Sequence, residues 1–182
     1  MEKIKIKNIS ILCASHKGFD DRGCIGCNCD DSCCKFGADF DEEAYQFVIQ
    51  HKDKIEKLIG VKIEDCFEKE IHKYSDYLGG QMRRSKMKGR YCVFHKLNKK
   101  GCTLYQLVHE EKISPRILPT ICKTFPLSWE NDKILLYNEQ ADSVIPIDCN
   151  CLEIANTSTK SILETQKDII DDVFEIENNL RN

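Results

Sequence analysis

Apolar residues recur at spacings of three and four between residues 41 and 59, which is the pattern of a helix with one buried face. Asp39 and Asp41 stand at the start of this stretch, where a short acidic side chain can accept hydrogen bonds from the first free backbone N–H groups. Gly60 follows the last apolar position, a common place for a helix to end. The pattern predicts a helix over residues 41–59 with Asp39 or Asp41 as its N-cap.

Two further stretches have helical spacing. Residues 160–178 carry apolar side chains every three or four positions, and Thr159 or Ser161 can cap a helix that begins there. A weaker pattern covers residues 62–78 and stops at two glycines. We therefore expect a C-terminal helix over residues 160–178 and a less regular one over residues 62–78.

Shorter elements are indicated by alternating isoleucines and by turn residues. Isoleucines alternate with other residues over positions 3–12, which suits one or two strands with one covered face. Residues 91–97, 98–101 and 103–112 have in turn the character of a strand, a tight turn and a helix. These segments predict that strands and helices are mixed along the chain.

A hairpin is predicted where two apolar runs flank Asn131 and Asp132, because both residues suit a tight turn. Helices mixed with short strands favour the α+β class. A chain of 182 residues, 41% of them hydrophobic, can bury one ordinary core. We expect a single small and irregular domain over residues 1–182, with short antiparallel hairpins and peripheral helices.

Cysteine is the residue type that points to chemistry. Of twelve cysteines, ten lie in three segments, residues 24–34, 92–122 and 149–151. These segments are flanked by Gly, Pro, Asp or Asn, so their side chains can converge from several loops on one point. We therefore expect the domain over residues 1–182 to be a cysteine-cluster domain organised by metal. The candidate metal ligands are Cys24, Cys27, Cys29, Cys33, Cys34, Cys92, Cys102, Cys122, Cys149 and Cys151.

The cell compartment decides how so many thiols are interpreted. The sequence begins with alternating Lys and Ile and has no run as apolar as a signal peptide or a membrane span. We therefore expect a cytoplasmic protein outside the membrane, whose reduced thiols indicate metal binding rather than disulfides. Thiolate ligands favour zinc, iron–sulfur clusters or Cu(I). Cys13 and Cys66 have apolar surroundings and are interpreted as core residues.

The adjacent pair of Cys33 and Cys34 carries its own information. Neighbouring side chains of an extended segment point to opposite sides, so this pair predicts two separate sites or a polynuclear centre. His95 lies three residues after Cys92. We interpret His95 as a strand residue with its ring at the surface, and metal ligation is the alternative.

A basic stretch overlaps the second cysteine segment, whereas the residues from 138 onward are rich in Asp and Glu. Between Tyr77 and His109 there are eight Lys and Arg and no acidic residue, although the net charge of the chain is −3. We interpret RRSKMKGR, at its start, as a solvated loop. The alternatives are that residues 83–100 stabilise an anionic cluster, or that they bind an anionic ligand or RNA. Arg116 is a candidate contact to a cofactor sulfur or an acidic partner, and a salt bridge explains it equally well.

The later cysteine motifs follow one another in a characteristic order. The CC pair is followed by CVF at Cys92, by CTLY at Cys102, and by a proline-containing loop that ends in CKTFP at Cys122. From residue 24 to 151 this arrangement resembles a bacterial family of cysteine-cluster proteins, described as a zinc- or iron-chelating domain and named for its CxxCxxCC motif. The resemblance implies metal binding.

The first motif departs from the family pattern. Cys24, Cys29, Cys33 and Cys34 fit a wider C-x4-C-x3-CC form, and Cys27 is then an extra cysteine. Which of Cys24, Cys27 and Cys29 are ligands therefore stays open. The cysteine segment is also similar to that of flagellin lysine N-methylases, which are much longer chains thought to carry an iron–sulfur cluster.

Three hypotheses for function follow. The first is an iron–sulfur protein, with a [4Fe–4S] cluster and a redox or electron-transfer role toward a protein or redox partner. It is favoured because thiols are abundant and histidines scarce in the cysteine segments. The second is a structural zinc module that binds a partner. The third, suggested only by the methylase likeness, is an iron–sulfur enzyme that modifies protein or nucleic acid. No catalytic nucleophile and base can be named.

Overall fold

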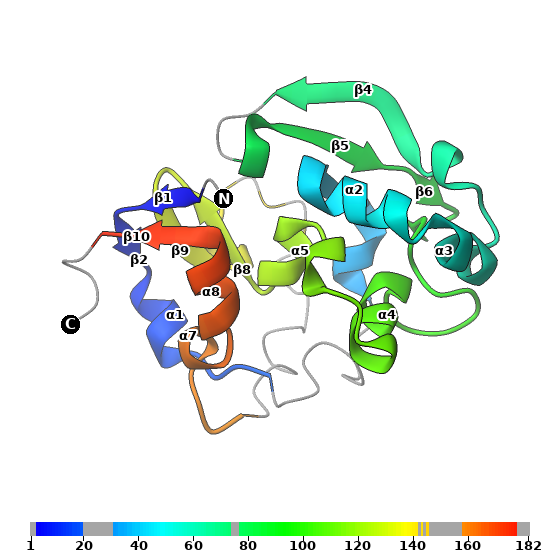
Figure 1. Ribbon diagram of the computed structural model, residues 1–182. Coiled ribbons are helices and arrows are strands. Elements are labelled where there is room, and N and C mark those ends of the chain that lie inside the picture. The colour runs from blue at the N-terminus through cyan, green and yellow to red at the C-terminus, as the bar shows by residue number, and fades with distance from the viewer. Residues whose placement is uncertain are drawn as a thin grey trace. The chain divides into compact units, whose positions relative to one another are not determined.

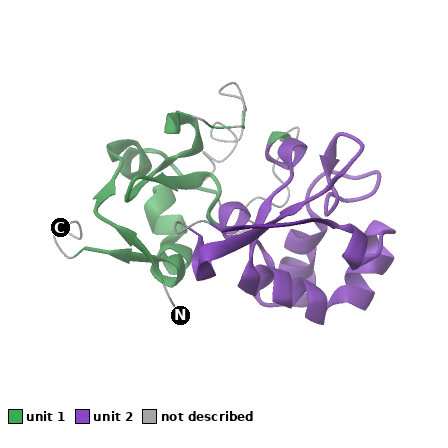
Figure 2. Ribbon diagram, turned by 90° about the horizontal axis from the view of Figure 1, so that it is seen from above, with its two compact units in different colours: residues 1–32, 124–182 green, residues 33–123 purple. Residues whose placement is uncertain are grey.

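The computed structural model describes residues 3–19, 31–73, 77–141, 143, 145 and 158–177. The chain forms two compact units (Figures 1 and 2). Unit 1 contains residues 1–32 and 124–182, and unit 2 contains residues 33–123. Both contain helices and small sheets, so the α+β class expected from the sequence is confirmed. The single domain over residues 1–182 stays a prediction.

Unit 2 combines antiparallel strands with helices (Figure 1). Its strands are β3 (Asp39–Asp41), β4 (Phe67–Lys73), β5 (Gln81–Ser85), β6 (Met87–Lys88) and β7 (Tyr91–Cys92). Its helices are α2 (Glu42–Gln50), α3 (Lys52–Ile59), α4 (Thr103–Glu111) and α5 (Thr120–Thr124), whose last residue belongs to unit 1. Its 3₁₀ turns include η1 (Ser32–Phe36), η2 (Ile63–Asp65), η3 (Leu78–Gly80) and η4 (Pro115–Ile117). One sheet has the order β3-β5-β4, and β6 pairs with β7.

Unit 1 is built from both ends of the chain (Figure 1). Its strands are β1 (Ile4–Ile6), β2 (Asn8–Ile9), β8 (Leu127–Glu130), β9 (Lys133–Leu136) and β10 (Phe174–Ile176). Its helical segments are α1 (Ile11–Ser15), η5 (Tyr137–Glu139), α7 (Ile162–Thr165) and α8 (Lys167–Val173). β1 pairs in parallel with β10, and β9 lies between β2 and β8. The predicted hairpin is confirmed: Asn131 and Asp132 have φ of 50° and 60° in a two-residue turn between β8 and β9.

The helix predicted over residues 41–59 is present with one interruption. α2 and α3 are separated at His51, and α3 ends at Gly60, which has the left-handed φ of 66°. Of the two N-cap candidates, Asp41 is the one used, because its Oδ1 accepts a hydrogen bond of 3.0 Å from the Ala44 N–H. The helix predicted over residues 103–112 is also confirmed as α4.

The helix expected over residues 62–78 is wrong. After the short turn η2 the chain forms the strand β4, in which Phe67 is the one buried residue. β4 is an edge strand and pairs with β5 from Phe67↔Ser85 to Lys73↔Gln81. The prediction of a solvated loop at RRSKMKGR, residues 83–90, is also wrong, because most of these residues lie in the paired strands β5 and β6. Pairing between distant strands overrides a weak local helical pattern.

Three further element boundaries differ from the expectation. The C-terminal helix over residues 160–178 is broken into α7 and α8, and the chain then extends as β10 beside β1. Ser161 caps α7 and forms a capping box with Glu164. The first segment is strand as far as Ile9, but the residues from Ile11 form α1. Over residues 91–97, the strand β7 covers only the first two positions.

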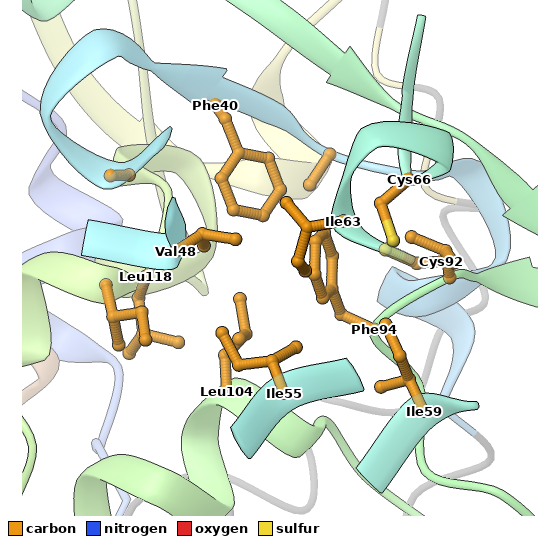
Figure 3. Close-up of a cluster of buried hydrophobic side chains, with 14 of the residues drawn as sticks. Phe40, Val48, Ile55, Ile59, Ile63, Cys66, Cys92, Phe94, Leu104 and Leu118 are labelled. Atoms are coloured by element: carbon orange, nitrogen blue, oxygen red, sulfur yellow. The ribbon is translucent and has the colours of Figure 1, made fainter. Parts of the chain in front are cut away.

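Unit 2 has an apolar core of its own (Figure 3). Its centre contains the rings of Phe40, Phe67 and Phe94, with centroids 5.1 to 5.6 Å apart. Phe40 and Phe94 are fully buried, and Cys66 and Cys92 lie beside Ile63 and Phe94 on one side of the cluster (Figure 3). Two thiols are therefore part of this core.

Asp41 supports a first prediction. Its side chain is buried, caps α2, and accepts two hydrogen bonds from Thr120 at the start of α5, from the N–H at 3.0 Å and the hydroxyl at 2.8 Å. Asp41→Ala should lower the free energy of unfolding by about 3 kcal/mol, because it removes a cap and leaves buried donors without an acceptor. Urea unfolding measures this loss. Asp53→Ala, an exposed change in α3, is the control and should cost less than about 0.5 kcal/mol.

Candidate metal centre

Five of the predicted ligands lie in unit 2, within its short elements or next to one. Cys33 and Cys34 belong to η1, and Cys92 is the last residue of β7. Cys102 is the residue before α4, and Cys122 lies in α5. The five cysteines thus come from three separate elements of unit 2 and from the residue before a fourth.

Four of these thiols interact electrostatically in every pairwise combination. Burial is the largest cause that raises the pKa of Cys92, Cys102 and Cys122. The negative charge of Cys33 raises the pKa of all three. The charge of Cys92 also raises the pKa of Cys102, and the charges of Cys92 and Cys102 raise the pKa of Cys122. The pKa of Cys102 is about 12. These four thiols, which come from η1, β7, α5 and the start of α4, therefore lie within range of one another's charge.

Cys34 belongs to the same group. Its pKa is raised first by a hydrogen bond with Cys33, then by burial, and further by the charges of Cys33, Cys102 and Cys122. The Sγ atoms of Cys33 and Cys34 are 3.9 Å apart. The expectation of an extended pair pointing to opposite sides is wrong, because η1 is a 3₁₀ turn that brings the two sulfurs into contact.

Hydrogen-bond donors surround two of the sulfurs. The N–H groups of Leu104 and Tyr105, in the first turn of α4, lower the pKa of Cys102 against the effect of burial. The hydroxyl of Ser85 is 3.3 Å from Cys92 Sγ and, with the Phe94 N–H, lowers the pKa of that thiol. Such donors favour thiolates, the form of cysteine that binds metal. No cysteine motif points to Ser85, which lies seven residues before Cys92 in the basic stretch.

Arg84 and Asp39 add charges near the thiols. Arg84 lowers the pKa of Cys92, whereas Asp39 raises that of Cys122. The Asp39 carboxylate accepts hydrogen bonds from Arg84 Nη1 at 2.8 Å and from the Tyr77 hydroxyl at 3.3 Å. The Asp39 carboxylate is thus paired with Arg84 and Tyr77. The sulfurs of the cysteines are the atoms that would bind a metal.

The described thiols do not have the arrangement of a formed metal site. Within the ranges that the structure describes, no three Cys, His, Asp or Glu side chains already have the arrangement of a metal site. The five sulfurs are near enough to repel one another as thiolates, and a metal ion would have to draw them closer.

The remaining predicted ligands lie elsewhere. Cys24, Cys27, Cys29, Cys149 and Cys151 fall outside the described residues. Cys13 and Cys66 are completely buried, which confirms their interpretation as core residues, and burial raises the pKa of each to about 12.

Arg116 and His95 have protein partners. Arg116 Nη1 is 2.8 Å from Glu43 Oε1, the salt bridge that the sequence left as its alternative. A contact from Arg116 to a cofactor stays a prediction. The His95 ring stacks on Tyr91 at 4.1 Å, and its Nδ1 is 3.0 Å from the Lys96 carbonyl oxygen.

Part of the basic stretch is used inside unit 2. Arg83 pairs with Glu42 at 3.4 Å and lies over the Tyr45 ring at 4.4 Å. Arg84 Nη2 also donates to the Phe36 carbonyl at 2.6 Å. Several later cations are exposed: Lys86, Lys88, Arg90, Lys99 and Lys100. Binding of an anionic partner there stays a prediction.

Comparison of the chain with models of protein families, with curated proteins and with solved structures gave no match. The resemblance to the CxxCxxCC family therefore stays a prediction. In the part of the chain that the structure describes, no helix is both long and apolar enough to span a membrane.

The raised thiol pKa values predict how stability depends on pH. Cys13, Cys66 and Cys102 have pKa values of about 12, against 9.0 for an ordinary thiol. The folded state favours the protonated thiol, so this contribution is complete below pH 9 and is lost as pH rises toward 12. Unfolding of the metal-free protein by urea should therefore become easier across this range.

Cys66→Ala tests the assignment, because other groups also titrate above pH 9. The variant is less stable at every pH, since it leaves a cavity, but its stability should fall less steeply between pH 9 and 11. Equal slopes for the two proteins would contradict a raised Cys66 pKa.

Proposed function

We propose that unit 2 binds a metal centre through Cys33, Cys92, Cys102 and Cys122, and that the centre is an iron–sulfur cluster with a redox or electron-transfer role. The observation that carries the proposal is the mutual electrostatic interaction of these four thiols, which come from η1, β7, α5 and the start of α4. Cys92 belongs to the apolar core of unit 2, and Cys102 and Cys122 pack against it, so the core itself positions three of the four thiols.

The chemistry of the donors fits such a centre. Thiolates bind iron–sulfur clusters, zinc or Cu(I) and do not suit magnesium or calcium. Counting Cys34, five thiols interact, which is one more than a single tetrahedral ion takes. A [4Fe–4S] cluster also takes four thiolates, so iron is favoured by the thiol-only set of ligands and not by their number. A bound cluster would supply one-electron transfer, and the hydrogen bonds to Cys92 and Cys102 would raise its reduction potential.

A structural zinc site is the second candidate, and one distance favours it. Two thiolates bound to one tetrahedral zinc are about 3.8 Å apart, given Zn–S bonds of about 2.3 Å. The sulfurs of Cys33 and Cys34 are 3.9 Å apart. Zinc held there would stabilise the folded state of unit 2 and would have no redox role.

Metal analysis of the anaerobically purified chain distinguishes the two candidates. We expect brown protein that contains iron and sulfide, with a [4Fe–4S] cluster as the first expectation. Colourless protein with stoichiometric zinc would establish the second candidate instead. Protein that contains neither metal, after purification and after reconstitution, would contradict both.

Cys33→Ser and Cys122→Ser test the ligands. Each should reduce the bound metal to about a tenth or less and lower the solubility, because loss of one ligand weakens the whole centre. Cys13→Ala is the matched control: it removes a completely buried thiol from unit 1 and should cost stability but no metal. Unchanged metal content in either serine variant would remove that residue from the ligands.

A further inference from the structure

Ser85 is a buried hydroxyl at the end of β5 that lies between two of the thiol segments. Its Oγ accepts a hydrogen bond of 2.8 Å from the Ala38 N–H, in the chain that leads out of η1. The same Oγ is 3.3 Å from Cys92 Sγ. Ser85 is only 2% exposed, so water does not compete for these contacts.

The direction of the contact with Cys92 follows from the hydrogens present. A hydroxyl has one hydrogen to donate, and a metal-bound thiolate has none. When Cys92 is a thiolate, the Ser85 hydroxyl is therefore the donor and Cys92 Sγ the acceptor. The Ala38 N–H donates to the oxygen of the same hydroxyl, which polarises the O–H group and strengthens its bond to sulfur.

The segment beside η1 is shaped to approach Ser85 closely. Gly37 has φ of 74°, and a Cβ added there would lie 3.0 Å from the Ser85 carbonyl oxygen and 3.3 Å from Ser85 Oγ. The Ser85 N–H donates to the Ala38 carbonyl at 2.8 Å, so backbone and side chain both bind this segment. Ser85 thus connects Ala38, which follows the Cys33–Cys34 turn, with Cys92 through hydrogen bonds.

We infer that Ser85 is a positioning residue of the metal centre. Its hydroxyl donates a hydrogen bond to Cys92 Sγ and holds that sulfur at a fixed position relative to the Cys33–Cys34 turn, η1. This inference rests on the proposed function. It extends the centre to a residue outside the cysteine segments, and it applies whether the centre contains iron or zinc, because both bind the same thiolates.

The test compares Ser85→Val with Ser85→Thr in the full chain. The two side chains have nearly the same shape and differ by the hydroxyl. Co²⁺ is the probe, because its thiolate charge-transfer bands report sulfur ligation, and competition with a chelator gives its affinity. We expect the Val variant to bind Co²⁺ about tenfold more weakly than the Thr variant, with weaker bands, as found for residues that orient metal ligands.

Ser128→Ala is the control for a general loss of stability. Ser128 is also 2% exposed, and its hydroxyl donates to Gln140 Oε1 at 2.9 Å in unit 1. It should leave Co²⁺ affinity and the charge-transfer bands unchanged. If Ser85→Val does not fold, Ser85→Ala takes its place in the comparison.

The outcomes separate the inference from the proposed function. Equal Co²⁺ affinity and spectra in the Val and Thr variants, with metal binding retained, would overturn the role of Ser85 alone. A loss in Ser128→Ala as large as that in Ser85→Val would also overturn it, because the effect would then be one of stability. A wild-type chain that binds no Co²⁺ would overturn both proposals.

Discussion

The contact between Phe40 and Phe94 is the constraint on which the position of the thiols depends. The two rings are fully buried, with centroids 5.2 Å apart. Phe40 lies in β3, shortly after the Cys33–Cys34 turn, and Phe94 lies between Cys92 and Cys102. The Phe94 carbonyl also accepts the Thr103 N–H at 2.8 Å, which connects it to the start of α4. Burial of each ring is worth about 2 to 3 kcal/mol, so hydrocarbon packing brings the sulfur segments near one another.

β5 gives this arrangement its polar connections. Its consecutive residues Arg83, Arg84 and Ser85 contact α2, the last residue of η1, and Cys92 respectively. These arginines come from a stretch with no acidic residue, and their partners are supplied by residues some forty positions earlier, Glu42 and Asp39. The basic character of this part of the stretch therefore serves pairing within unit 2. The apolar core and these ion pairs together form the scaffold of unit 2. The proposed metal centre would lie where Cys33, Cys92, Cys102 and Cys122 border this scaffold.

Local patterns predicted the elements whose ends carry their own signals. The helix pair α2 and α3 has an acidic cap at Asp41 and a glycine at its end, and the β8–β9 hairpin has two residues suited to its turn. The pattern failed where a partner strand competes with it. Residues 67–73 pair with β5, and residues 174–176 pair with β1, almost the full length of the chain away. Apolar spacing within one segment contains no information about such a partner.

The order and spacing of the cysteines led to the prediction that thiols from distant segments gather, because turn residues beside them indicate where side chains can converge. Only the folded arrangement showed which of the described thiols affect one another's pKa. It also showed that Cys13 and Cys66 are fully buried, and that Cys33 and Cys34 contact each other in a 3₁₀ turn. It also added Ser85, a residue that no spacing rule selects. The reason is physical: spacing along the chain constrains neighbours within a few residues, whereas hydrogen bonds and charge interactions depend on distances that packing of the core decides.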